Sequence, residues 1–274
     1  SCSFSYLLEP LQKFISKIIL TTSLQTSKKS LSTGSFEFNP FKYNINSAAL
    51  ITVFTDLFNN FSFNRGSSKW FFDFSNHRRN GKSLLTYGYE SNRLNDWLLK
   101  WRMNMGRTMS ISLNAKKRLM ELLTPQFNNR NYQLTMYSLE PAFVYNKMTK
   151  FGVTASYKFD DRKNNPLFGD QKSTSHSFTL ESVYSSLQRF SLRGKFTVNG
   201  IKYRDANTTP INAANTTVAY IMLDGLLPGT NYLWSMEIRK RLMNNLDLTI
   251  LYNGRKSGSS RTVHIGTVGA NVLF

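Results

Sequence analysis

The chain has 274 residues, enough for one large all-β domain, and its 35 Lys and Arg against 16 Asp and Glu give a formal net charge of +19. In a soluble protein this charge would indicate nucleic acid or another polyanion as a partner, but outer membranes also present polyanions. The single cysteine, Cys2, excludes an intrachain disulfide and a cysteine-rich zinc site, and no run of about 18 apolar residues could form a transmembrane helix.

The first predicted strand runs from about Lys13 to Thr26, which leaves residues 1–12 as a tail or as the end of a preceding region. A polar stretch follows and predicts a long loop, with a short ribbon at Phe36–Phe38. The next strand, about Ala49–Asn64, places its apolar residues on one side and most of its polar residues on the other.

A strand that begins at Trp70 is predicted to run out into a basic loop at residues 77–91. The clearest alternation comes next. Trp97, Leu99, Trp101 and Met103 point to one face, while Leu98, Lys100, Arg102 and Asn104 point to the other. A face with this many cations cannot be a dry core, so it must meet solvent or a wet lumen.

The same alternation predicts further strands along the rest of the chain. They lie at about residues 109–116, 132–143, 151–159, 178–184, 190–199, 232–239, 246–253 and 262–274. The phase of alternation slips near Tyr137, which predicts a bulge. The longest connection, Tyr203–Thr230, holds VAYIML as a candidate short ribbon.

The connections alternate in length, with short ones near Gly106 or Ser186 and longer ones near Pro125 or Ala213. Transmembrane barrels show this pattern, because tight turns face the periplasm and long loops face outward. The predicted fold is therefore an all-β, antiparallel transmembrane barrel of about twelve strands in the bacterial outer membrane, spanning residues 13–274. Aromatic residues, 14% of the chain, suit the interfacial girdles of such a barrel.

Four segments resemble the C-terminal barrel of large outer-membrane proteins from Bacteroidota, a family without a characterised function. They read ANTTVAYIMLDGLLPGTNYLWSMEIRKRL, ILYNGRKSGSSRTVHIGTVGANVLF, NNRNYQLTMYSLEPAFVY and KSLLTYGYES. The resemblance covers about Lys13 to Phe274 and implies location and architecture rather than a reaction. Family members usually carry a long portion before the barrel. The start at Ser1, without Met or a signal peptide, predicts that this chain is the C-terminal part of a larger barrel protein.

The alternation assigns side chains to two environments. The predicted lumen-facing residues are Asp73, Lys100, Arg102, Lys116, Lys158, Glu181, Arg193, Lys195, Glu237, Arg239 and Asp247. The predicted lipid-facing residues are Trp97, Leu99, Trp101, Met103, Trp234, Met236, Ile238, Ile250 and Phe274. The last strand ends on Val272 and Phe274, the aromatic C-terminal pattern that the barrel-assembly machinery reads as an insertion signal.

Two interpretations of the lumen remain open. A lumen rich in fixed cations would favour anions in an open pore. Alternatively, a closed barrel holds paired charges and water, or is plugged by a preceding portion. Six cations in predicted loops are a further candidate group, able to bind lipopolysaccharide phosphates. They are Arg78, Arg79, Lys82, Arg255, Lys256 and Arg261.

Catalysis and bound cofactors are not expected. His77, His176 and His264 lack metal-ligand spacing, and no nucleophile elbow or phosphate-binding loop occurs. We therefore predict a membrane anchor or a pore or translocation part of a larger surface protein. Its expected partners are outer-membrane lipid and lipopolysaccharide, the assembly machinery, and other surface or periplasmic proteins.

Two alternative functions make different demands on the sequence. An outer-membrane hydrolase would need rim pairs such as Asp73 with His77, or Asp160 with His176. A soluble basic protein that binds nucleic acid would need aromatic and cationic side chains on one shared face. In the strand at 97–104 they alternate between faces, which argues against nucleic acid as a partner.

Overall fold

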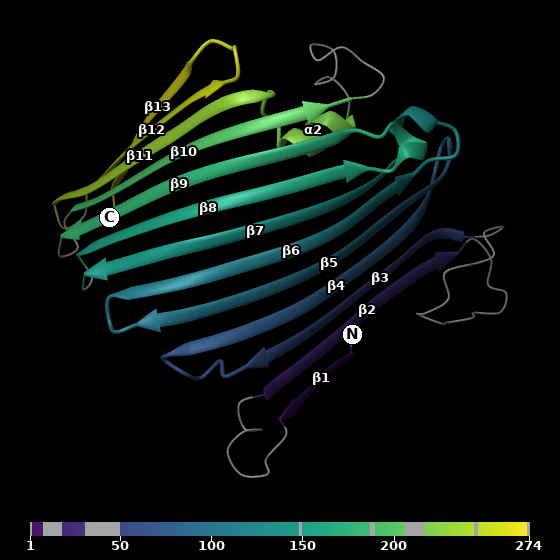
Figure 1. Cartoon of the computed structure of the whole chain (residues 1–274), viewed down its shortest axis with the longest axis horizontal. Helices are drawn as coiled ribbons and strands as arrows, with labels where there is room; N and C mark the ends of the chain where they lie inside the picture. The colour runs from purple at the N-terminus through teal and green to yellow at the C-terminus, as the bar shows by residue number, and fades with distance from the viewer. Residues whose placement is uncertain are drawn as a thin grey trace.

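The computed structural model describes residues 2–7, 18–30, 50–147, 150–186, 190–205, 217–243 and 246–272. These residues form one antiparallel sheet of 13 strands, in which each strand pairs with its neighbours in the sequence. Figure 1 shows a single twisted and curved sheet, with β1 and β13 at its two opposite edges. Among the described residues, no helix has the length and hydrophobicity needed to cross a membrane.

The strands follow one another with few interruptions. They are β1 Cys2–Leu7, β2 Ile18–Ser30, β3 Leu50–Phe63, β4 Trp70–Leu85, β5 Gly88–Met105, β6 Met109–Leu123, β7 Tyr132–Lys147, β8 Phe151–Asn164, β9 Lys172–Ser186, β10 Phe190–Arg204, β11 Gly229–Met243, β12 Leu246–Ser257 and β13 Val263–Val272. In the described parts of the connections lie two 3-10 turns, η2 Asn128–Arg130 and η3 Pro166–Phe168, and the helix α2 Thr217–Leu223.

The all-β antiparallel architecture is confirmed, and β2 to β13 correspond to the twelve predicted strands. The strand β1 differs from the prediction of an N-terminal tail at residues 1–12. It pairs with the first half of β2, from Cys2 opposite Leu24 to Leu7 opposite Ile19. The beginning of the first predicted strand, residues 13–17, and the ribbon at Phe36–Phe38 lie outside the described residues.

Three local predictions are wrong. The basic stretch at residues 77–91 is not a loop, because β4 and β5 continue through it to a two-residue turn at 86–87. VAYIML forms the helix α2 rather than a ribbon. No bulge occurs near Tyr137, because β6 and β7 stay in one register from Met109 opposite Tyr145 to Leu122 opposite Tyr132.

The strands are also longer than a bilayer requires. A tilted strand crosses a membrane in about 9–11 residues, whereas β5 has 18. On one face of β5, the residues from Trp97 to Met105 are apolar, and the positions before them on that face are Asn95, Arg93 and Ser91. The half of β5 nearest the long connections therefore stands above the apolar band, which explains why alternation fades there.

The sheet is open in the described residues, because β1 pairs only with β2 and β13 pairs only with β12. An unpaired strand edge within lipid leaves backbone groups without partners, at a cost of several kcal/mol per group. Both edges therefore require a covering strand when the sheet is in a membrane.

Candidate functional site

The strand register places the predicted lumen-facing residues on one face of the sheet, which we call the inner face. Asp73 lies opposite Lys100, and Lys195 lies opposite Glu181. The strict alternation within each strand then puts the others on the same face: Arg102, Lys116, Lys158, Arg193, Glu237, Arg239 and Asp247. The sheet thus gathers the predicted charged set on one continuous face.

The predicted lipid-facing residues lie on the opposite, outer face. Leu99 stands opposite Phe74 on β4 and Ala115 on β6, and Ile250 stands opposite Ile238 and Val268. Large apolar side chains on this face are strongly exposed, as in Phe178 at 48% and Met236 at 41%. A soluble sheet would cover such a face, whereas lipid covers it in a membrane barrel. Val272 ends β13 on this face, and Phe274 lies outside the described residues.

The helix α2 packs against the inner face near the long connections (Figure 1). Val218 and Met222 of α2 contact Tyr132 and Leu134 of β7, which are 4% and 0% exposed. The surrounding apolar residues lie on the inner face of β6, β7 and β10, among them Met120, Met136 and Tyr203. This cluster explains the slip in alternation near Tyr137. Apolar residues of β7 face inward before that position to meet α2, and face outward after it.

One arginine holds the end of α2. The Arg162 guanidinium on β8 donates hydrogen bonds to the carbonyl oxygens of Ile221, at 2.9 Å, and Met222, at 3.2 Å. It also binds both carboxylate oxygens of Asp224, at 2.8 and 2.5 Å, and one oxygen of Asp160, at 3.1 Å. Carbonyls at a helix C-terminus lack partners within the helix and carry partial negative charge. Arg162 therefore satisfies the end of α2 and ties the helix to the barrel wall.

A polar hollow of about 480 Å³ lies below α2 on the inner face. Its cations come from three strands and are Lys100, Lys116, Arg118, Lys158 and Arg162, while its acids are Glu140, Asp160 and Asp224. Most of these cations are paired: Arg118 binds Asp96 through two 2.7 Å hydrogen bonds, and Lys158 lies 2.8 Å from Asp160. Within the described residues, the side chain of Lys100 makes no ion pair or hydrogen bond.

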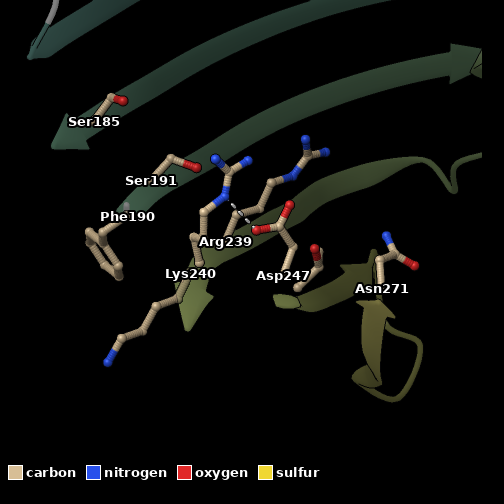
Figure 2. Close-up of a pocket in the computed structure, with 9 residues that line it drawn as sticks. Ser185, Phe190, Ser191, Arg239, Lys240, Asp247 and Asn271 are labelled. Atoms are coloured by element: carbon tan, nitrogen blue, oxygen red, sulfur yellow. Dashed lines mark hydrogen bonds and ion pairs between the residues drawn. The ribbon is translucent and has the colours of Figure 1, made fainter. Parts of the chain in front are cut away.

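A second hollow of about 430 Å³ lies on the inner face near the short turns (Figure 2). Ser185, Ser191, Arg239 and Asp247 line it from four neighbouring strands, and Arg241 lies 3.0 Å from Asp247. Figure 2 shows Phe190 and Lys240 pointing away from Arg239 and Asp247, as strand alternation requires. Charged side chains therefore line the inner face at both ends.

The candidate catalytic pairs are not assembled. His77 lies 2.6 Å from Asp56 on β3, rather than against Asp73. Asp160 is on the inner face, whereas His176 is on the outer face, where it lies 2.6 Å from the Tyr157 hydroxyl. His264 lies 2.8 Å from the Tyr252 hydroxyl. In the described ranges, no three His, Cys, Asp or Glu side chains gather as metal ligands would.

The prediction that six cations lie in loops is wrong for five of them. Of that group only Arg261 lies in a connection, because β4 and β12 extend through the other positions. Arg79 and Arg255 belong to the inner face, and Arg79 binds Asp56 at 3.0 Å. Arg78, Lys82 and Lys256 belong to the outer face.

No protein-family model and no curated protein sequence matches this chain. Solved structures do. The siderophore receptor PirA from Pseudomonas aeruginosa aligns with a TM-score of 0.58 and 10% identity, over 98% of this chain and 56% of that chain. The ferric-catecholate import receptor Fiu from E. coli K12 aligns with a TM-score of 0.57 and 8% identity, over 93% and 52%. The copper transporter OprC gives 0.51 and 8%, over 94% and 52%.

At such low identities these structural alignments show the fold alone, and the fold is that of a bacterial outer-membrane β-barrel. This chain spans about half the length of the three proteins. The resemblance to proteins from Bacteroidota stays a prediction.

Proposed function

We propose that the chain forms part of the wall of a larger outer-membrane transport barrel, that α2 narrows the passage from inside, and that the chain itself catalyses no reaction. The observation that carries this proposal is α2, which is packed on the charged inner face and tied there by Arg162. A membrane anchor needs no helix inside its barrel, whereas a passage needs something to restrict leakage.

Two further observations support the larger barrel. Both edges of the described sheet are open, and the chain aligns with about half of PirA, Fiu and OprC. These three proteins are a siderophore receptor, a ferric-catecholate import receptor and a copper transporter, so transport of a solute is the activity we infer. The ion pairs on the inner face favour a narrow, water-filled passage over a wide anion-selective pore, since most cations there already have a carboxylate partner.

Liposome swelling in a series of small neutral solutes tests the proposal with the full protein. Met222→Asp places a charge at a residue that is 2% exposed in the cluster of α2 with β7, so the helix should leave the inner face. We expect the rate of solute entry to rise several-fold. Tyr220→Asp, on the same helix at a position that is 66% exposed, is the matched control and should leave the rate unchanged.

If folded Met222→Asp protein admits no more solute than the wild type, α2 does not restrict a passage. The anchor role would then be the better reading of this barrel. Protease protection of the reconstituted barrel confirms insertion in each sample.

A further inference from the structure

The outer face changes from apolar to polar at a definite point on each of several strands. On β4 the change follows Phe74, and on β5 it precedes Trp97. On β7 it precedes Tyr137, and on β8 it follows Phe159. Aromatic residues thus stand at the border, as they do at the interface between lipid tails and headgroups.

Above this border, on the side of the long connections, the outer face is strongly basic. Its cations, which we call the outer basic belt, are Lys28, Arg78, Lys82, Arg93, Lys117, Lys163, Lys172, Lys202, Arg204 and Lys256. Among the described strand residues, the acids on this part of the face are Glu121 and Asp161. The belt therefore carries a large excess of positive charge on the side that faces lipid.

Aromatic rings lie beside two of these cations. The Lys117 ammonium lies 5.6 Å from the centre of the Trp97 ring and 5.4 Å from that of Tyr137. The Lys82 ammonium lies 4.8 Å from the centre of the Tyr89 ring. A long cationic side chain that rests on an interfacial ring places its stem on apolar surface and its charge among headgroups.

The belt contains a shaped pocket. A hollow of about 520 Å³ opens on the outer face, and Arg78, Arg93, Asn95, Gln133 and Thr135 line it together with Glu121. Arg93 lies 3.8 Å from Glu121, which also accepts a 3.1 Å hydrogen bond from the Gln133 side chain. The two guanidinium groups outweigh the charge of the single Glu121 carboxylate. Together with the three neutral polar side chains they can surround a phosphate, since arginine binds phosphate through paired N–H groups.

We propose that this pocket, with the outer basic belt around it, binds the phosphate headgroups of anionic lipids in the outer leaflet. The positive charge of the pocket favours a phosphate. Its position favours the phosphate of a lipid, because exposed apolar residues such as Phe74 and Leu139 continue directly below the border. A nucleic acid or a free polyanion would leave that adjacent apolar band in contact with water. The proposal concerns the outer face and does not depend on a passage through the barrel.

Tryptophan quenching by brominated phosphatidylglycerol, in bilayers of phosphatidylcholine, measures the relative association constant of anionic lipid with the full protein. The test variant is Arg78→Gln with Arg93→Gln. Each basic residue near an anionic surface contributes about 1 kcal/mol, which is about fivefold in association. We therefore expect the preference for phosphatidylglycerol to fall by about fivefold per arginine removed.

The matched control is Arg102→Gln with Lys195→Gln, which removes the same charge from the inner face and should leave the preference unchanged. Inorganic phosphate in the buffer, at the concentration of lipid phosphate, should not reverse the quenching. Equal loss in both double variants, or no loss in the outer one, would overturn the proposal. Reversal by inorganic phosphate would overturn the assignment to a lipid.

Discussion

The facing of β6 gives the most direct test of the barrel architecture. Leu113 lies on the outer face, opposite Trp101 on β5 and Pro141 on β7. Lys117, four positions along the same strand, marks the border of the apolar band. At about 3.3 Å per residue and a tilt of about 40°, Leu113 lies about 10 Å below that border. The band of such barrels is about 25 Å tall, so Leu113 is near its middle.

We expect Leu113→Arg to lower the free energy of unfolding by about 2–4 kcal/mol, because an arginine near the bilayer midplane loses its hydration. Leu119→Arg keeps the same strand and face but lies beyond Lys117, among headgroups, where the cost falls to about 0–1 kcal/mol. Leu98→Arg, on the inner face of β5 beside the polar hollow, adds a charge in contact with water and should be equally mild.

Urea titration of the full protein folded into liposomes measures all three variants in one system. Band shifts on unheated gels report the folded fraction at each urea concentration. An equal loss for Leu113→Arg and Leu98→Arg would mean that the two faces meet the same environment. That result would refute the membrane orientation assigned to this sheet.

Three other predictions concern the helix α2, the membrane topology and the C-terminal residue. Arg162→Ala should speed hydrogen exchange of the α2 amides by at least tenfold, because it leaves the Asp224 carboxylate and the carbonyls of Ile221 and Met222 without their donor. Arg193→Ala removes an exposed arginine that lies 3.7 Å from Glu181, so it should change this exchange little. In a background without the native cysteine, a cysteine at Leu167, which is 86% exposed, should react with an impermeant label in whole cells. A cysteine at Arg107, in a turn at the opposite end of the strands, should not react. Labelling of both would contradict the antiparallel order of turns. Removal of Phe274 should reduce the amount inserted in cells more than it lowers the melting temperature of the inserted protein, and normal insertion would show that this residue is not part of an assembly signal.

Alternation alone predicted which side chains share a face of the sheet, because a wall between lipid and water has a period of two in side-chain polarity. It failed where that contrast disappears. In residues 77–91 both faces of the sheet are polar, since the strands stand above the apolar band, and a strand that is polar on both sides resembles a loop in the sequence. Pairing across the sheet, not polarity, makes this stretch a strand.

The inward contacts of α2 could not be predicted for a different reason. The side chains of Tyr132, Leu134 and Met136 are apolar on the face that is charged elsewhere, and the switch of phase near Tyr137 was visible in the sequence. Its cause lies some 80 residues away in α2, and no local pattern links Arg162 to Asp224. Apolar residues on the charged face of a barrel strand are therefore evidence of something packed inside.

In the last two strands, the same substitution at two glycines should change the free energy of unfolding in opposite directions. Gly254 on β12 and Gly266 on β13 both lie on the outer face, beside Tyr252 and His264. A Cβ at Gly254 would clash with the Trp234 ring, which covers this glycine and has its centre 5.8 Å from that of His264. A Cβ at Gly266 would meet nothing within 4 Å.

Gly266→Ala should raise the free energy of unfolding by about 0.5–1 kcal/mol, because alanine loses less backbone entropy than glycine. Gly254→Ala gains the same entropy but displaces Trp234, at an overpacking cost of about 1–3 kcal/mol that includes the lost aromatic contact. We therefore expect Gly254→Ala to destabilise the folded protein in liposomes. If both alanines stabilise it to the same extent, Trp234 does not rest on β12, and the aromatic cluster at this end of the outer face is absent in the membrane.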